Sequence, residues 1–236
     1  MKRRFDITRV FLADGCNLDC DYCCAKGGFE PRFTMWGFEQ FLKTARADEL
    51  LLSGGEPTMS RLLGDALCAA RSSFDGVISV ETNGLLLTMD KVFERLMTSP
   101  PDLLYWNLIA LDPDSFRLIT RRRLPDGLLD RVSDALNRTG VPVVLSITPV
   151  PGNVAEIPRL AAYGSSRLEH LKEIRILRPV PLAPNPSYYS VLEAGLRRVL
   201  HVTRGQPPVT VDTRFPARLS AHLPVHPIRT AALGRE

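Results

Sequence analysis

The chain has 236 residues, of which 44% are hydrophobic and 24% are charged, and its formal net charge is +4 at pH 7. This length and apolar content suit one or two globular domains with a substantial core. No stretch approaches the ~20 uninterrupted apolar residues of a membrane span, and the basic N-terminus lacks the apolar segment of a signal peptide, so we expect a cytoplasmic protein outside the membrane. The sequence has no broad basic stripe with interleaved aromatic residues, so it gives no indication of nucleic-acid binding.

An apolar run over residues 5–13, predicted to be a strand, leads into three closely spaced cysteines, Cys16, Cys20 and Cys23. The CxxxCxxC spacing can supply three ligands to an iron–sulfur cube and leaves one iron open, whereas simple [4Fe–4S] carriers are closed by four cysteines. A structural zinc site would need a second ligand pair, and none follows. Incidental buried thiols are the other alternative, although a polar, glycine-containing loop begins at Cys24. The pattern favours a cluster.

Two further polar turns each follow a short apolar strand. Strands predicted over 49–53 and 77–82 run into the sequences Gly54-Gly55-Glu56-Pro57 and Thr82-Asn83-Gly84. Adjacent glycines let the backbone turn sharply and approach a ligand closely. Either turn alone is also typical of a plain strand-to-helix connection, in which Thr82 and Asn83 would cap the next helix.

The rest of the chain continues the alternation of strands and helices. Further strands are predicted over 103–111, 142–148 and 172–178, and helices over 35–47, 59–73, 88–98, 126–139, 153–164 and 187–200. Such alternation indicates right-handed βαβ units and a parallel sheet, which is an α/β fold. Ligands of parallel α/β folds gather at the carboxyl ends of the strands, so the three motifs can form one site.

These three motifs, in this order, resemble those of radical S-adenosylmethionine (radical SAM) enzymes. The resemblance implies a partial (β/α)6 barrel over residues 1–182, with 183–236 as a helix and Pro/Arg-rich extension of the same domain. It implies one [4Fe–4S] cluster on the catalytic cysteines, SAM as cofactor, and an electron donor such as a flavodoxin or ferredoxin. The residues that it implies for SAM binding are Tyr22, Gly54, Gly55, Glu56, Thr82, Asn83 and Asp112. An Asp-Pro-Asp stretch makes Asp112 an equally good helix N-cap.

Within this family, residues 104–182 resemble the molybdenum-cofactor cyclase group, the MoaA-like enzymes. The stretch from Trp106 to Phe116 is similar to that group's strand ending in SLD followed by P-x-x-F. The chain departs from the group at Ala110, Val144 and Ser146, where the group tends to place serine, lysine and asparagine. The group also binds its substrate on a second cluster held by cysteines near the C-terminus. No cysteine follows Cys68 in this sequence, so we expect no second all-cysteine cluster.

Several isolated features carry weaker indications. Cys24 is either a spectator thiol or a hydrogen donor beside the cluster, and Cys68 is expected in the core because its segment is amphipathic. The basic run Arg121–Arg123 can attract a phosphate or carboxylate, or form a solvated face. His222 and His226 are four residues apart, but nearby prolines argue against a helical metal site.

The sequence therefore predicts an enzyme that acts on a polar or anionic small molecule in a biosynthetic pathway, such as a nucleotide, nucleoside or sugar derivative. A first alternative is modification of a peptide or protein, including activation of a glycyl-radical enzyme. A second is a non-catalytic iron–sulfur regulatory protein on the same barrel.

Overall fold

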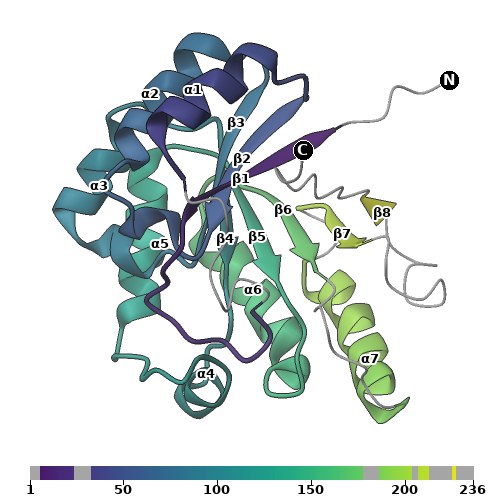
Figure 1. The fold of residues 1–236 in the computed structure, drawn as a ribbon. Helices are drawn as coiled ribbons and strands as arrows, with labels where there is room; N and C mark the ends of the chain where they lie inside the picture. The colour runs from purple at the N-terminus through teal and green to yellow at the C-terminus, as the bar shows by residue number, and fades with distance from the viewer. Residues whose placement is uncertain (1–5, 24–32, 178–185, 204–206, 213–224, 227–236) are drawn as a thin grey trace, which may run out of the picture.

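The computed structural model describes residues 6–23, 33–177, 186–203, 207–212 and 225–226. Within these ranges, eight parallel strands form one open sheet in chain order, with β1 at one edge and β8 at the other (Figure 1). The strands are β1 (Ile7–Ala13), β2 (Glu49–Gly54), β3 (Val77–Thr82), β4 (Leu103–Asn107), β5 (Val143–Ile147), β6 (Leu171–Ile176), β7 (Val209–Asp212) and β8 (Val225–His226).

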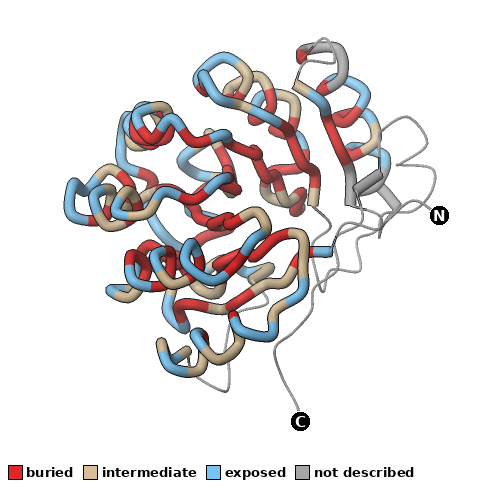
Figure 2. Tube along the Cα trace, turned by 90° about the horizontal axis from the view of Figure 1, so that it is seen from above, coloured by how far each residue is buried: buried red, intermediate tan, exposed pale blue. Residues whose placement is uncertain are grey.

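Helices lie between successive strands from β1 to β7 and pack beside one another along the outer face of the sheet (Figures 1 and 2). The α-helices are α1 (Met35–Thr44), α2 (Leu63–Ser73), α3 (Asp90–Met97), α4 (Pro113–Thr120), α5 (Leu128–Thr139), α6 (Ile157–Arg167) and α7 (Pro186–Thr203). Short 3-10 helices are η1 (Pro57–Met59), η2 (Leu85–Thr88) and η3 (Val154–Glu156). No helix among the described residues combines the length and apolar character needed to cross a bilayer.

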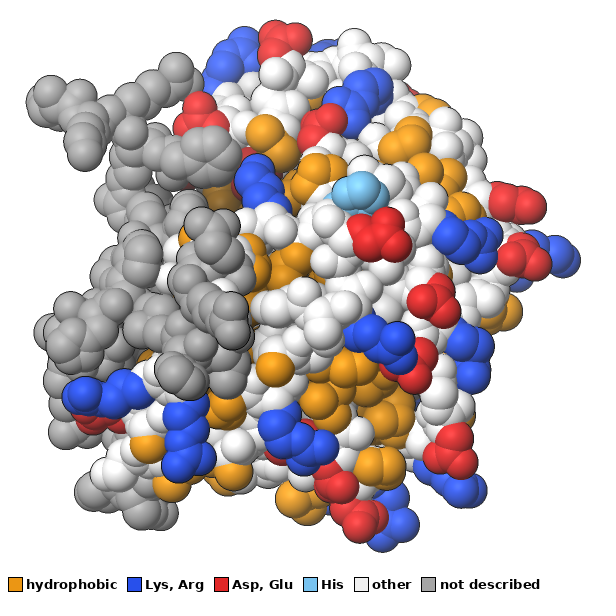
Figure 3. Space-filling view, turned by 180° about the vertical axis from the view of Figure 1, so that it is seen from behind, with side chains coloured by type: hydrophobic (Ala, Val, Ile, Leu, Met, Phe, Trp, Pro, Cys, Tyr) orange, Lys and Arg blue, Asp and Glu red, His pale blue; other side chains and the backbone are white. Residues whose placement is uncertain are grey.

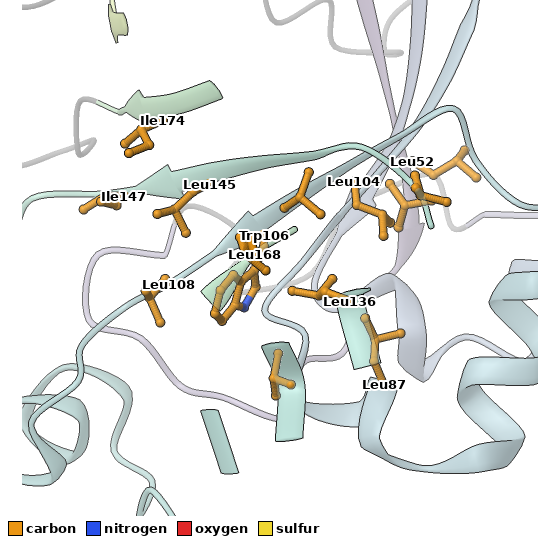
Figure 4. Packing of buried hydrophobic residues seen from close by; sticks show 14 of the residues in the cluster. Leu52, Leu87, Leu104, Trp106, Leu108, Leu136, Leu145, Ile147, Leu168 and Ile174 are labelled. Atoms are coloured by element: carbon orange, nitrogen blue, oxygen red, sulfur yellow. The ribbon is translucent and has the colours of Figure 1, made fainter. Parts of the chain in front are cut away.

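The main core lies between the outer face of the sheet and the helices. Alternate strand residues such as Leu52, Leu104 and Leu145 point outward and are fully buried (Figure 4). Leu87 and Leu136 meet them from the helical layer. The inner face carries a second, smaller apolar cluster, so the strands are buried on both sides, as is usual for parallel sheets.

The predicted α/β fold with parallel strands is confirmed. The first six strands lie within a few residues of their predicted ranges, although β4 ends at Asn107 rather than residue 111. Helix α4 is not among the predicted helical ranges, although Asp112 was considered as a helix N-cap, and β7 and β8, which extend the sheet beyond β6, were not predicted. The division of the chain at residue 182 stays a prediction.

The expectation that Cys68 lies in the core is wrong, because its side chain is exposed on α2. The buried stripe of this helix is formed by Leu63, Ala66, Leu67 and Ala70, which recur every three or four residues. Cys68 lies outside that stripe. Cys24, His222 and most of the Pro/Arg-rich extension lie outside the described residues.

Candidate functional site

The three sequence motifs meet at the carboxyl ends of β1, β2 and β3. The turn after β2 lies directly against the segment that carries the cysteines, because Gly55 N donates to Ala13 O at 2.6 Å and Glu56 N donates to Gly15 O at 2.8 Å. A Cβ on Gly55 would lie 2.1 Å from Gly15 O, so only glycine permits this approach. The close backbone approach expected toward a ligand is therefore, in this structure, an approach to the chain's own cysteine segment.

Glu56 joins the second motif to the third. Its buried carboxylate accepts hydrogen bonds from Thr58 Oγ1 at 2.6 Å, Thr82 Oγ1 at 2.6 Å and Asn83 N at 2.8 Å. Burial raises the pKa of Glu56, while these donors pull the pKa down because they favour the charged form. Because its oxygens accept hydrogen bonds from both turns, the role of Glu56 is to position Thr82 and Asn83.

Asn83 extends the connection to the cysteine segment. Its Nδ2 donates to Asn17 Oδ1 at 2.8 Å and lies 3.9 Å from Cys16 Sγ, while its Oδ1 accepts from Leu85 N at 3.0 Å. The fully buried Trp106 donates from Nε1 to the Asn83 carbonyl at 3.1 Å. The Asn83 side chain thus both caps the next turn and contacts the cysteine segment.

The three cysteines are partly buried, and none forms a disulfide. Burial raises the pKa of the Cys16 thiol, and the nearby charges of Glu56 and Cys23 raise it further, against a hydrogen bond from Leu18 N at 3.4 Å. Burial, together with the nearby Cys20 and Cys23, raises the pKa of Tyr22, and this ring packs against the same apolar cluster as Cys16 and Cys20. A raised pKa keeps the Cys16 thiol protonated near neutral pH, so binding of this sulfur to a metal would release a proton.

The donor set fits a cluster with one open iron. Three thiols lie on one eight-residue segment, beside the polar groups of Asn17 and Asn83. Among the described residues, no three His, Cys, Asp or Glu side chains converge closely enough to hold a single metal ion. A cube does not need such convergence, because its thiolates bind separate iron corners.

Two buried residues that were not predicted as site residues organise the loops after β4 and β5. Asn153 donates from Nδ2 to Ile109 O at 2.7 Å and to Thr148 O at 3.1 Å, so it joins the two loops directly. Glu156 Oε2 accepts from the backbone N–H groups of Leu111 and Asp112 at 3.0 and 3.2 Å. Both residues lie within the segment 104–182 that resembles the cyclase group, but the resemblance predicted no role for either.

Asp112 is the N-cap of α4, and its side chain accepts from Ser115 N at 2.8 Å. These contacts lower the pKa of Asp112. The helix-capping alternative is therefore what the structure contains, and a role of Asp112 in SAM binding stays a prediction.

The inner face of the sheet holds paired polar side chains. Glu81 accepts from Ser53 Oγ at 2.6 Å and Asn107 Nδ2 at 3.3 Å, and lies 3.4 Å from the guanidinium of Arg9. Although burial alone would raise the pKa of Glu81, Arg9 and these donors lower it overall. Deeper in the sheet, Arg175 pairs with Glu173 at 3.0 Å.

A small cavity of about 20 Å³ lies between these groups. Its lining residues are Ile7, Arg9, Leu51, Glu81, Tyr105, Ser146, Arg175 and Leu177. This volume is about that of one water molecule. Val144, at the position where the cyclase group tends to place lysine, belongs to the apolar cluster on this face and is 1% exposed.

Ala110 and Arg121 both lie close to the cysteine segment. Ala110, where the cyclase group has serine, is completely buried in an apolar cluster with Leu18 and Phe116. Arg121, from the basic run, pairs with Asp21 in the cysteine segment. Among the described residues of the face shown in Figure 3, acidic and basic side chains are interspersed around a hydrophobic area and form no basic stripe.

Comparisons with known proteins agree with this arrangement. The family model of the radical SAM superfamily matches residues 10–163. GTP 3′,8-cyclase of Thermodesulfovibrio yellowstonii is 27% identical over 195 residues, which cover 78% of this chain and 59% of that protein. A probable GTP 3′,8-cyclase of Methanocella arvoryzae is 32% identical over 169 residues, covering 68% of this chain and 53% of that protein. The chain thus spans little more than half the length of these relatives.

Solved structures show the same fold at lower sequence identity. Streptococcus suis SuiB bound to S-adenosylmethionine superposes with a TM-score of 0.65 at 16% identity, covering 88% of this chain and 47% of that one. Native anSMEcpe with bound AdoMet and a peptide gives a TM-score of 0.64 at 14% identity, covering 87% of this chain and 63% of that one. The family match covers well over half of the residues, and the relatives confirm the resemblance to the MoaA-like group. The chain belongs to the radical SAM superfamily, whose members use a [4Fe–4S] cluster and S-adenosylmethionine.

Proposed function

We propose that this chain is a radical SAM enzyme with one [4Fe–4S] cluster, and that it acts on a small polar metabolite such as a nucleotide, nucleoside or sugar derivative. When bound and reduced, the cluster supplies the electron that splits SAM into methionine and a 5′-deoxyadenosyl radical, which removes a hydrogen atom from the substrate. An external electron donor such as a flavodoxin or ferredoxin would deliver that electron.

The observation that carries this proposal is the hydrogen-bonded assembly of all three motifs at one end of the sheet. The Glu56 N–H donates to the Gly15 carbonyl, and the Glu56 carboxylate accepts from the Asn83 N–H. The Asn83 side chain in turn donates to Asn17 in the cysteine segment. In this proposal Cys16, Cys20 and Cys23 hold three iron corners. SAM would bind at the remaining open iron, beside the polar edge formed by the two turns.

The residues around that edge have separate roles in the proposal. Thr82 and Asn83 are candidates for polar contacts to the ribose and carboxylate of SAM, and Tyr22 borders the cysteines. Gly54 and Gly55 present backbone groups to the amino group of the methionine moiety. Glu56 positions these groups, since its carboxylate already accepts four hydrogen bonds within the turns.

The nucleotide-like substrate class rests on the relatives, which are GTP 3′,8-cyclases. Against the same reaction stands Val144, which belongs to the apolar cluster on the inner face at the position where the cyclase group tends to place lysine. We therefore propose a related C–H abstraction on a different small molecule.

Anaerobic reconstitution with iron and sulfide tests the proposal. The reduced protein with SAM should form 5′-deoxyadenosine, and the amount should rise when the true substrate class is present. Deuterium-labelled nucleosides, nucleotides and sugar phosphates, with a peptide pool alongside, identify the substrate by transfer of one deuterium into 5′-deoxyadenosine. A reconstituted cluster that yields no 5′-deoxyadenosine above the unreduced sample would instead support the non-catalytic iron–sulfur alternative.

A further inference from the structure

The cysteine segment is docked on the C-terminal end of α4, about a hundred residues away in sequence. Two backbone hydrogen bonds join them, from Asp19 N to Thr120 O and from Asp21 N to Ile119 O, both at 3.0 Å. In Figure 1 the dark purple stretch after β1 runs past α4. Both amides lie between the cysteines, so the contact fixes the backbone that carries Cys20 and Cys23.

A bidentate ion pair completes this contact. Arg121 donates from Nε to Asp21 Oδ1 at 3.1 Å and from Nη2 to Asp21 Oδ2 at 2.6 Å. Two parallel donors of a planar guanidinium fix the orientation of a carboxylate as well as its distance. Asp21 is thereby held at a defined position between Cys20 and Cys23.

The backbone of Arg121 is unusual for a residue with a long side chain. Its φ of 57° lies in the left-handed region, and it is the one non-glycine residue with positive φ in the described part of the chain. Glycine ends helices in this conformation without strain, whereas other residues pay a conformational cost. A glycine here could cap α4 but could not supply the guanidinium.

Apolar packing supports the same contact. Leu18 belongs to a small buried cluster with Phe116 and Ile119 of α4, and Cys16 and Cys20 pack against that cluster. Helix α4 thus contacts the cysteine segment through apolar side chains at its middle and through the Arg121–Asp21 ion pair at its C-terminal end.

We infer that Arg121 is a positioning residue for the iron–sulfur cluster, acting through Asp21 on the segment that holds Cys20 and Cys23. This inference rests on the proposed function, since it assumes that the cysteines bind the cluster. The alternative role of the basic run, attraction of an anionic ligand, is disfavoured for Arg121 because its guanidinium already binds a carboxylate.

The size of the expected effect follows from the exposure of the pair. Both side chains are about half exposed, at 53% and 51%, so solvent weakens the attraction. An exposed pair of this kind shifts a local equilibrium by about two- to fivefold, which is too little to change global unfolding strongly. The effect should therefore appear as faster local opening of the cysteine segment.

The test compares Arg121→Gly, Arg121→Ala and Asp21→Asn with wild type. Arg121→Gly removes the guanidinium without adding backbone strain, and Asp21→Asn removes the charge without changing α4. Arg123→Ala is the matched control, because this neighbouring arginine is exposed and has no ion pair with any described residue. The exchanged pair Asp21→Arg with Arg121→Asp tests rescue, since aspartate tolerates positive φ better than most residues.

Two measurements apply to every variant. The first is the rate at which a chelator removes iron from the anaerobically reconstituted protein. The second is amide hydrogen exchange over residues 16–23 in the metal-free protein. We expect about two- to fivefold faster iron release and faster exchange in Arg121→Gly and Asp21→Asn, wild-type rates in Arg123→Ala, and recovery in the exchanged pair.

The outcomes separate this inference from the proposed function. Wild-type protein that takes up no iron would contradict the proposed function. Wild-type protein that holds the cluster while Arg121→Gly and Asp21→Asn release iron at the wild-type rate would overturn the positioning role. Loss in Arg121→Ala alone, with Arg121→Gly unchanged, would overturn it as well, because the backbone conformation and not the guanidinium would then be responsible.

Discussion

Gly55 shows why a motif glycine can serve the fold and the site together. Its missing side chain lets the turn after β2 reach the backbone of Gly15, one residue before the first cysteine. The sequence indicated that a close approach occurs at this turn. It could not indicate that the approached group belongs to the chain itself, because backbone positions distant in sequence leave no local pattern.

We predict that Gly55→Ala destabilises the metal-free protein by more than about 2 kcal/mol, because the new Cβ would meet backbone atoms that cannot move aside. Gly15→Ala is the matched control. A Cβ there meets nothing within 4 Å, so we expect a change within about 1 kcal/mol. Urea unfolding of both variants measures the difference, and equal stability of the two would contradict the packing argument.

The cysteines give a second prediction at the same scale. Alanine at Cys16, Cys20 or Cys23 should abolish the brown chromophore near ~400 nm that a thiolate-bound iron–sulfur cluster gives after reconstitution. Alanine at Cys68, exposed on α2, should leave the chromophore unchanged. Absorbance and iron content per chain are measured together. A cluster that survives loss of Cys20, for example, would exclude the three-cysteine assignment.

At the scale of elements, polar side chains fix how neighbouring segments are positioned against one another. Apolar packing alone would let these segments slide. Asp102, just before β4, accepts from Ile78 N of β3 at 2.8 Å. The same carboxylate binds Arg71 of α2 at 2.9 and 3.0 Å. Burial would raise the pKa of Asp102, but Arg71 and the Ile78 N–H outweigh burial and lower it.

We expect Asp102→Asn to reduce the free energy of unfolding by about 0.5–1 kcal/mol at pH 7, a value discounted for the partial exposure of the pair. A lowered folded-state pKa stabilises the protein above the unfolded pKa of about 3.9, and this stability is lost as the pH falls through the folded pKa. The difference between wild type and variant should therefore shrink as the pH falls below about 4 and vanish once the pH is below the folded-state pKa.

Asp75→Asn is the matched control, because Asp75 is an exposed carboxylate in the turn between α2 and β3. Its replacement changes the net charge equally and should leave stability within about 0.5 kcal/mol of wild type at every pH. A constant difference between wild type and Asp102→Asn down to pH 3 would show that the charge of Asp102 is not the stabilising feature.

The elements that were predicted well are those with a repeated apolar pattern. Strands β2 and β3 were found nearly residue for residue, since short apolar runs end there at glycine-containing turns. Helix α4 was missed because it spans only eight residues and begins at Pro113 beside an Asp-rich turn. Its partner, the cysteine segment, lies a hundred residues away, and periodicity carries no information about such contacts.

Across the whole molecule, the two tryptophans report on opposite environments. Trp106 is completely buried in the main core, whereas Trp36 at the start of α1 is 73% exposed. We predict that Trp36→Phe leaves one emitter that iodide does not quench in the native protein and that shifts to longer wavelength on unfolding. Its stability should lie within about 0.5 kcal/mol of wild type, as for other exposed positions.

Trp106→Phe is the complementary variant. Its remaining emitter, Trp36, should be quenched by iodide in the native protein, and its stability should fall by about 1–3 kcal/mol through the lost hydrogen bond to the Asn83 carbonyl and imperfect packing. Equal iodide quenching in both variants would contradict the placement of Trp106 in the core.

The sequence order of the strands also sets a sequence of events during synthesis. β1, β2 and β3 are consecutive along the chain and adjacent in the sheet, so the three motifs can assemble soon after β3 leaves the ribosome. Arg121 follows Asp21 by 100 residues, which at about 5–20 residues per second corresponds to a delay of about 5–20 s. During that interval the newly made cysteines have neither α4 nor its arginine beside them, and we expect iron delivered then to be lost more readily than iron delivered after release.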